Sequence, residues 1–187
     1  MTSSSEKAQS RKKPLLIFFG CAALLFLAIV GEWQFETNFY RRALPAELET
    51  EGLATTGSDF SLLRLLMPIR LEACGGAIFR LTERNVADIK RQGLSFFRAA
   101  RQGRGYQEGD PGYRSHIYQP WQEAPVPDSW VSEGTWLGLA CMNLGRDLTR
   151  SITSAARGPG VYFTTTTGGA FLVVLPEMKL VVFTYTS

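Results

Sequence analysis

Histidine is almost missing from this chain of 187 residues, which contains only His116. The sequence also has no Gly-x-Ser-x-Gly motif, no Cys/His spacing of a metal site and no glycine motif that would cradle a phosphate. A hydrolase needs a nucleophile, a base and an oxyanion site, and these patterns would supply them. We therefore expect no metal and no cofactor, and we assign no catalytic residue.

Charged residues are missing from one long stretch, 14–31, which reads PLLIFFGCAALLFLAIVG. At 1.5 Å per residue, a helix of this length covers about 27 Å of hydrocarbon, which is enough to cross a bilayer. Basic residues precede the stretch and acidic residues follow it: Lys7, Arg11, Lys12 and Lys13, then Glu32 and Glu36. An excess of Lys and Arg marks the cytoplasmic side. We predict a cytoplasmic tail at 1–13, a transmembrane helix at 14–33 and an exported remainder.

The same stretch has competing explanations. A cleaved signal peptide also begins with basic residues, but its apolar region is usually about 7–15 residues long and ends at a small-x-small site. Here the run is longer, and bulky Ile29 stands where a small residue is wanted. Lipidation at Cys21 is disfavoured by the Phe18-Phe19-Gly20 that precedes it and by the apolar run that follows. A buried helix of a soluble protein would have a polar face, which this stretch lacks.

The formal net charge of +3 comes from the first 13 residues. That tail holds four of the 20 Lys and Arg and one of the 17 Asp and Glu, so 16 residues of each sign remain. A neutral exported part gives no basis for binding a polyanion. We expect no nucleic-acid partner.

Two of the three cysteines, Cys74 and Cys141, lie in the exported part, where disulfides persist. We predict a bond between them, with two buried thiols as the alternative. A second alternative makes Cys74 the nucleophile and His116 the base of a cell-envelope hydrolase. The exported part has no Asn-x-Ser/Thr glycosylation site, which favours a bacterial periplasm and therefore an inner-membrane anchor.

The exported part divides into a polar linker at 34–57 and one domain at 58–187. We predict a short helix within 59–67, then a strand at 69–81 that is broken by a glycine bulge at Gly75–Gly76. A helix capped by Thr82 follows and extends to Ala100, with its arginines on the solvated face: Arg84, Arg91 and Arg98. A second helix is expected at 146–157. Residues 135–144 are apolar and fit either a strand or a helix.

The carboxyl-terminal part is rich in Val, Thr, Phe and Tyr and has turn residues between its apolar runs. It predicts three strands, at 160–166, 170–175 and 180–186, joined as an antiparallel meander. Strands and helices do not alternate regularly along the chain, so the expected class is α+β. In this arrangement the antiparallel sheet is packed by two or three helices.

Residues 103–134 form a long irregular segment with many aromatic side chains. Such segments on a rigid scaffold often carry binding surfaces, where Tyr, Trp and Arg contribute most of the energy. We predict the binding residues to be Tyr113, Arg114, Tyr118 and Trp121. The expected function is a membrane-anchored, non-catalytic binding or accessory protein, such as a subunit of an envelope complex or an immunity-type inhibitor. Another envelope protein is the expected partner, and a cell-wall glycan is the alternative ligand.

Overall fold

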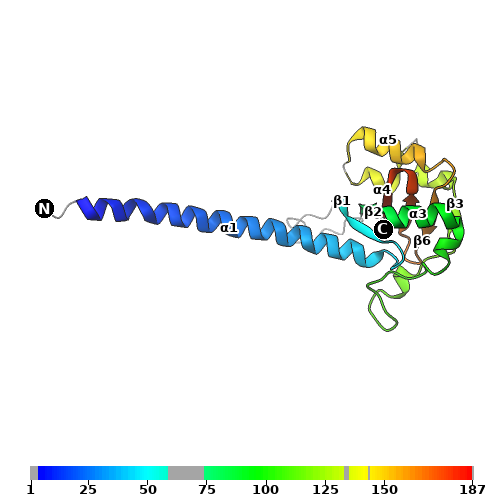
Figure 1. Ribbon diagram of the computed structural model, residues 1–187, viewed down its shortest axis with the longest axis horizontal. Coiled ribbons are helices and arrows are strands. Elements are labelled where there is room, and N and C mark those ends of the chain that lie inside the picture. The colour runs from blue at the N-terminus through cyan, green and yellow to red at the C-terminus, as the bar shows by residue number, and fades with distance from the viewer. Residues whose placement is uncertain (1–3, 59–73, 133–134, 143, 187) are drawn as a thin grey trace. The chain divides into compact units, whose positions relative to one another are not determined.

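The computed structural model describes residues 4–58, 74–132, 135–142 and 144–186. It divides into two compact units, Met1–Asn38 and Phe39–Ser187. The short helix expected within 59–67 lies outside the described residues. The ribbon is drawn in Figure 1.

The first unit is helical throughout its described length. Helix α1 (Ser4–Ala43) includes the apolar stretch and continues into the second unit, where it ends. Within the part of the chain that the structure describes, this is the one helix long and apolar enough to cross a membrane, over Phe19–Ala43 by length and composition. Side chains near its far end, Tyr40 and Ala43, are buried in the second unit, so they do not face lipid.

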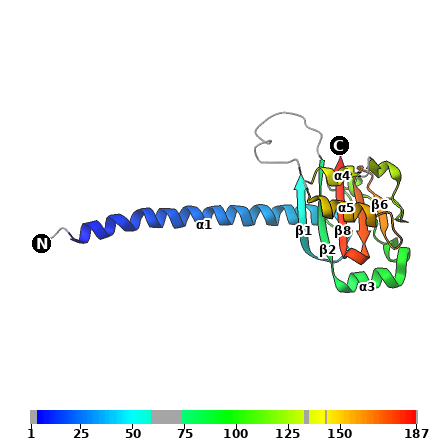
Figure 2. The ribbon, with the colours of Figure 1, turned by 90° about the horizontal axis from the view of Figure 1, so that it is seen from above.

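The second unit is built on an antiparallel sheet of six strands in the order β1-β2-β8-β7-β6-β3. The strands are β1 (Thr50–Ser58), β2 (Cys74–Leu81), β3 (Gln122–Glu123), β6 (Tyr162–Thr165), β7 (Phe171–Leu175) and β8 (Leu180–Thr186). Figure 2 shows β1, β2 and β8 side by side. A separate two-stranded ladder pairs β4 (Val131–Ser132) with β5 (Thr135–Trp136). The expected α+β class and antiparallel sheet are confirmed.

Both faces of the sheet are covered, which explains the continuous apolar runs of its strands. Successive side chains of a strand point to opposite faces. In β7, Leu172 and Val174 belong to one core cluster, whereas Val173 and Leu175 belong to another. The first cluster also contains the end of α1 and the helix after β2, and the second contains the helices after β5.

Helices of the second unit lie on both sides of the sheet. They are α3 (Glu83–Gln92), α4 (Leu137–Ala140) and α5 (Arg146–Ala155), with short 3-10 turns η1 (Gly93–Arg98), η2 (Arg114–His116), η3 (Asp128–Trp130) and η4 (Pro176–Met178). In Figures 1 and 2, α5 covers one face of the sheet. Within residues 135–144, which the sequence left open, Thr135–Trp136 form β5 and Leu137–Ala140 form α4.

Helix α3, the helix that follows β2, is shorter than its sequence predicts. Thr82 caps α3 as expected, since its hydroxyl accepts a 3.1 Å hydrogen bond from the Asn85 N–H. The helix ends at Gly93 because this residue has φ 57°, a left-handed value that glycine adopts at little cost. The chain continues as η1, so Arg98 does not belong to the helical face that carries Arg84 and Arg91.

Two other expectations differ from the structure. The segment 34–57, expected to be a linker, supplies β1 and the buried side chains of Leu44 and Leu48, because these apolar residues fill the core beside the end of α1. The expected glycine bulge is also wrong, since β2 pairs with β8 residue by residue. Gly76 instead allows close packing: a Cβ at that position would lie 2.3 Å from the Phe183 carbonyl oxygen.

Candidate functional site

The carboxyl-terminal end of α1 is held by groups from the first part, 103–118, of the irregular segment 103–134. The last carbonyl groups of a helix have no partner within it. Here the Gly105 N–H donates to the Arg42 carbonyl at 3.0 Å. The Tyr118 hydroxyl donates to the Ala43 carbonyl at 2.6 Å. Burial raises the pKa of Tyr118 far above its ordinary value, so the hydroxyl keeps its proton.

Arg104 binds the chain immediately after α1. Its Nη2 donates to the carbonyl groups of Pro45 and Leu48 at 2.7 and 2.6 Å, and its Nε donates to that of Leu44 at 3.3 Å. Burial lowers the pKa of the Arg104 guanidinium, which nevertheless stays protonated at physiological pH. These hydrogen bonds hold the chain that follows α1 against the irregular segment.

Near these hydrogen bonds, three side chains form a stack: Arg42, Tyr106 and His116. The Arg42 guanidinium carbon is 5.3 Å from the centroid of the Tyr106 ring. On that ring, the His116 imidazole stacks with a centroid distance of 3.6 Å and an interplanar angle of 11°. The Nδ1 of His116 donates to the Gly112 carbonyl at 2.9 Å. His116 is therefore part of the packing of the segment.

A surface pocket of about 190 Å³ opens beside η1. Its walls are formed by Leu94, Ser95, Arg98, Arg101 and Pro120, above the more deeply buried Phe97 and Trp121. The Phe97 and Trp121 rings are stacked, with centroids 4.3 Å apart and an angle of 26°. Trp121 Nε1 donates to the Ala100 carbonyl at 2.7 Å, which fixes the indole. The pocket thus combines a rigid aromatic floor with two cationic side chains.

The four predicted binding residues occupy different environments. Tyr118 and Trp121 are 1% and 7% exposed, and their ring centroids lie 6.4 Å apart within the core. Tyr113 is half-buried and Arg114 is exposed, both at η2 and outside the pocket lining. The structure therefore gives Tyr118 a role in holding the end of α1, and Trp121 is the one of the four that lines the pocket beside η1.

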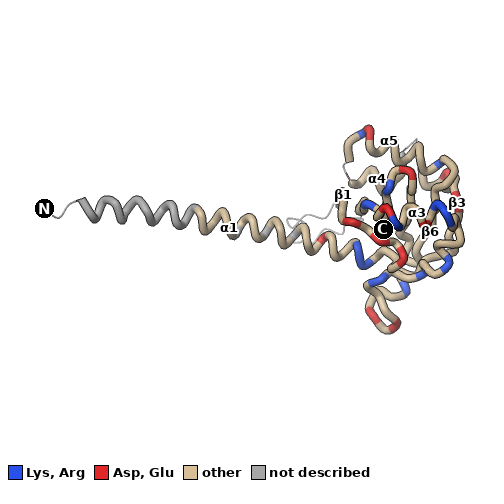
Figure 3. Tube along the Cα trace, viewed as in Figure 1, with Lys and Arg blue, Asp and Glu red and all other residues tan. Residues whose placement is uncertain are grey.

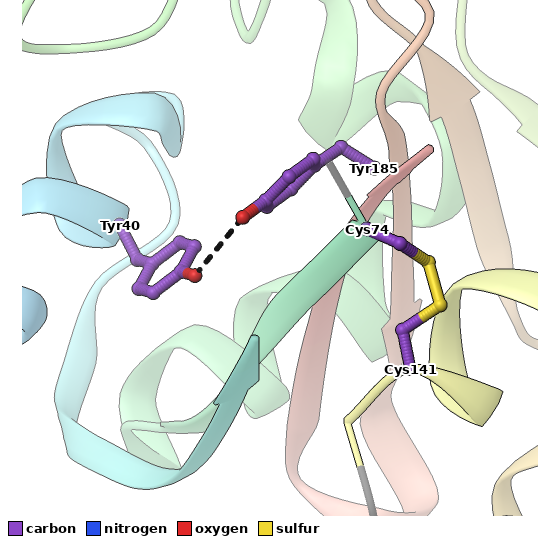
Figure 4. The surroundings of a disulfide bond; sticks show 4 residues. All are labelled: Tyr40, Cys74, Cys141 and Tyr185. Atoms are coloured by element: carbon purple, nitrogen blue, oxygen red, sulfur yellow. Dashed lines mark hydrogen bonds between the residues drawn. A yellow bond between two sulfur atoms is a disulfide. The ribbon is translucent and has the colours of Figure 1, made fainter. Parts of the chain in front are cut away.

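The Cys74 and Cys141 sulfur atoms form a disulfide, with the two Cα atoms 5.7 Å apart. Figure 4 shows this bond joining the start of β2 to the residue after α4. The same view shows the hydroxyl groups of Tyr40 and Tyr185 facing each other at 3.5 Å. A cysteine in a disulfide has no thiolate, so the pairing of Cys74 with His116 in a hydrolase has no nucleophile while the bond persists.

Charges of both signs are interspersed along the trace of the second unit (Figure 3). The described residues contain no group of three or more His, Cys, Asp or Glu side chains that could hold a metal ion. The chain matches no protein-family model, no curated protein and no solved structure. Function must therefore be argued from the residues.

Sequence reasoning missed most of the pocket. Leu94, Phe97, Arg98 and Arg101 all lie before the segment that was expected to bind, 103–134. They were assigned to a continuous helix or its flank. The break at Gly93 changes which way these side chains point. Gly93 itself was the available signal, since glycine is the residue most often found just past a helix end.

Proposed function

We propose that this protein is a single-pass anchor protein of the bacterial inner membrane, with its amino terminus in the cytoplasm and its folded unit in the periplasm. It acts as a non-catalytic binding or accessory protein through contacts with another envelope protein. The apolar part of α1, the basic residues before it and the disulfide of the second unit support this location.

The pocket beside η1 is the observation that carries the binding role. Its floor consists of aromatic rings held in place by their own contacts, so a ligand would lose little free energy in ordering them. Leu94 on its wall is 43% exposed, so its side chain adds apolar surface that a ligand can cover. Trp and Arg beside it are the residue types that dominate binding energies in protein interfaces.

A cell-wall glycan is the second candidate ligand because Trp121 lines the pocket and indole rings stack on sugars. The lining argues against it. Sugars are held by many hydrogen bonds to their hydroxyl groups, and Ser95 is the one residue with a neutral polar side chain among the described residues that line the pocket. The two arginines favour a ligand with negative charge.

Photo-crosslinking in living cells tests the proposed function. Ser95 at the pocket and Ser151 on α5 are both exposed serines, so each can be replaced by a photoreactive amino acid without loss of core packing. We expect the group at position 95 to join the protein to one partner that mass spectrometry identifies as an envelope protein. The group at position 151 serves as the matched control. Absence of any adduct at position 95 in correctly inserted protein would contradict a binding role for this face.

A further inference from the structure

The two arginines of the pocket lack acidic partners among the described residues. Arg98 and Arg101 are exposed and form no ion pair with a described residue. Elsewhere in the second unit, Arg91 and Arg150 pair with acidic side chains of their own helices. The pocket therefore presents positive charge that the described parts of the chain do not neutralise.

The size of the pocket limits what it can hold. Its volume of about 190 Å³ is below the roughly 300–1,000 Å³ of typical small-molecule and cofactor sites. One apolar side chain can occupy such a space while the rest of its ligand continues over the rim. Arg98 and Arg101 both line the pocket together with the aromatic rings of Phe97 and Trp121.

We propose that this pocket binds a short acidic peptide segment of the partner protein. An apolar side chain of that segment packs on Phe97, Trp121 and Leu94. Carboxylates next to it in the segment bind Arg98 and Arg101, whose planar guanidinium groups can each donate two parallel hydrogen bonds to one carboxylate. This inference rests on the proposed function, and it adds the chemistry of the partner.

Selection from a random peptide library tests the inference. The full chain, held in nanodiscs of neutral phosphatidylcholine, is presented with displayed random seven-residue peptides. We expect enrichment of peptides in which Asp or Glu stands beside Phe, Trp, Leu or Met. The double variant Arg98→Glu/Arg101→Glu should recover these peptides at least about tenfold less well, since hydrogen bonds between charged groups are among the stronger ones.

Two further variants test whether the loss of binding is specific to the pocket. Arg146→Glu/Arg157→Glu changes the net charge equally at two exposed arginines on the other side of the sheet, and it should bind the selected peptides as the natural chain does. Leu94→Ser removes an apolar wall without a change of charge, and it should weaken binding several-fold. Near-ultraviolet circular dichroism of the tryptophans shows whether each variant retains its fold.

The inference is overturned if no peptides are enriched, if the enriched peptides are not acidic, or if folded Arg98→Glu/Arg101→Glu binds them unchanged. Displacement of the peptides by phosphatidylglycerol vesicles, with equal binding of those vesicles to the pocket, would make lipid head groups the ligand and overturn it too. A partner crosslinked at Ser95 without peptide selection would leave the proposed function standing. Selected peptides without any crosslinked partner in cells would contradict the proposed function alone.

Discussion

The hydroxyl group of Tyr118 donates a 2.6 Å hydrogen bond to the carbonyl oxygen of Ala43, 75 residues earlier in the chain. This bond joins the irregular segment to the end of the helix that carries the apolar stretch. The same end accepts the N–H of Gly105 and lies next to the carbonyl groups bound by Arg104. A segment that the sequence presents as a binding loop is thus also the structural cap of α1.

Replacement of Arg104 by Met should destabilise the second unit. The substitution keeps much of the side-chain volume but leaves the Leu44, Pro45 and Leu48 carbonyl groups without this donor. Loss of a partner from buried polar groups costs about 1–3 kcal/mol of unfolding free energy. The free energy of unfolding is measured by urea denaturation of the full chain in detergent, monitored by tryptophan fluorescence. Arg157→Met, at an exposed site, is the control and should change the free energy of unfolding by less than about 0.5 kcal/mol. Equal stability of the two variants would contradict the role of Arg104.

Tyr118 should make stability fall at high pH. Burial raises the pKa of this phenol in the folded state above its ordinary value of 10.0, so above that pH the unfolded chain loses a proton that the folded chain keeps. Its contribution is fully present below pH 10 and decreases as pH rises further, by up to about 1.4 kcal/mol per pH unit. The stability difference between the natural chain and Tyr118→Phe should therefore narrow between pH 9.5 and 11. A difference that stays constant in urea titrations across this range would show that the folded phenol ionises normally.

Much of the fold was predictable because its signals are local. The apolar stretch, the Thr82 cap and the β-rich carboxyl-terminal runs each identify their own element. The linker was misassigned because Leu44 and Leu48 are isolated apolar residues, and only the three-dimensional arrangement shows the core that they enter. The pocket depends on the break at Gly93 and on the stacking of Phe97 with Trp121, 24 positions later in the numbering. Contacts at that separation leave no periodic pattern in a sequence.

Removal of the disulfide should cost stability without loss of the fold. For a separation of 67 residues, the chain-entropy treatment gives about 4 kcal/mol. Cys74→Ser/Cys141→Ser should show this loss in urea denaturation of the full chain. Cys21→Ser removes an exposed thiol on α1 and should leave the stability of the second unit unchanged. Mass spectrometry of unreduced peptides checks the bond directly, and free alkylation of both thiols in native protein would contradict it.

Gly76→Ala should destabilise the sheet. The new Cβ would meet the Phe183 carbonyl oxygen at 2.3 Å, so β2 and β8 must move apart where they pair. Overpacking of this kind costs about 1–3 kcal/mol. Gly52→Ala, in β1, is the matched control because a Cβ there meets nothing within 4 Å. Thermal unfolding of both variants provides the comparison, and similar midpoints would show that the strands accommodate the methyl group.

Reporter fusions test the proposed orientation. Alkaline phosphatase joined after Ser187 should be active, since it folds only outside the cytoplasm, whereas green fluorescent protein exported by the same route should remain dark. Conversion of Lys7, Arg11, Lys12 and Lys13 to Glu should weaken this orientation, because the basic tail sets it. An inactive phosphatase fusion together with a fluorescent fusion to green fluorescent protein would show the opposite topology, with the folded unit in the cytoplasm.

The bond between Cys74 and Cys141 also affects how the protein responds to proteolysis. It closes a covalent ring that contains residues 75–140, and both the pocket and the exposed residues 107–112 lie within that ring. A protease that cuts the backbone once at those exposed residues therefore releases no fragment, because each piece stays attached through sulfur. The nicked chain would remain one covalent molecule until a reductant separates the pieces. The disulfide thus keeps Pro120 and Trp121, which follow the cut, covalently attached to the piece that carries α1 and the other residues of the pocket.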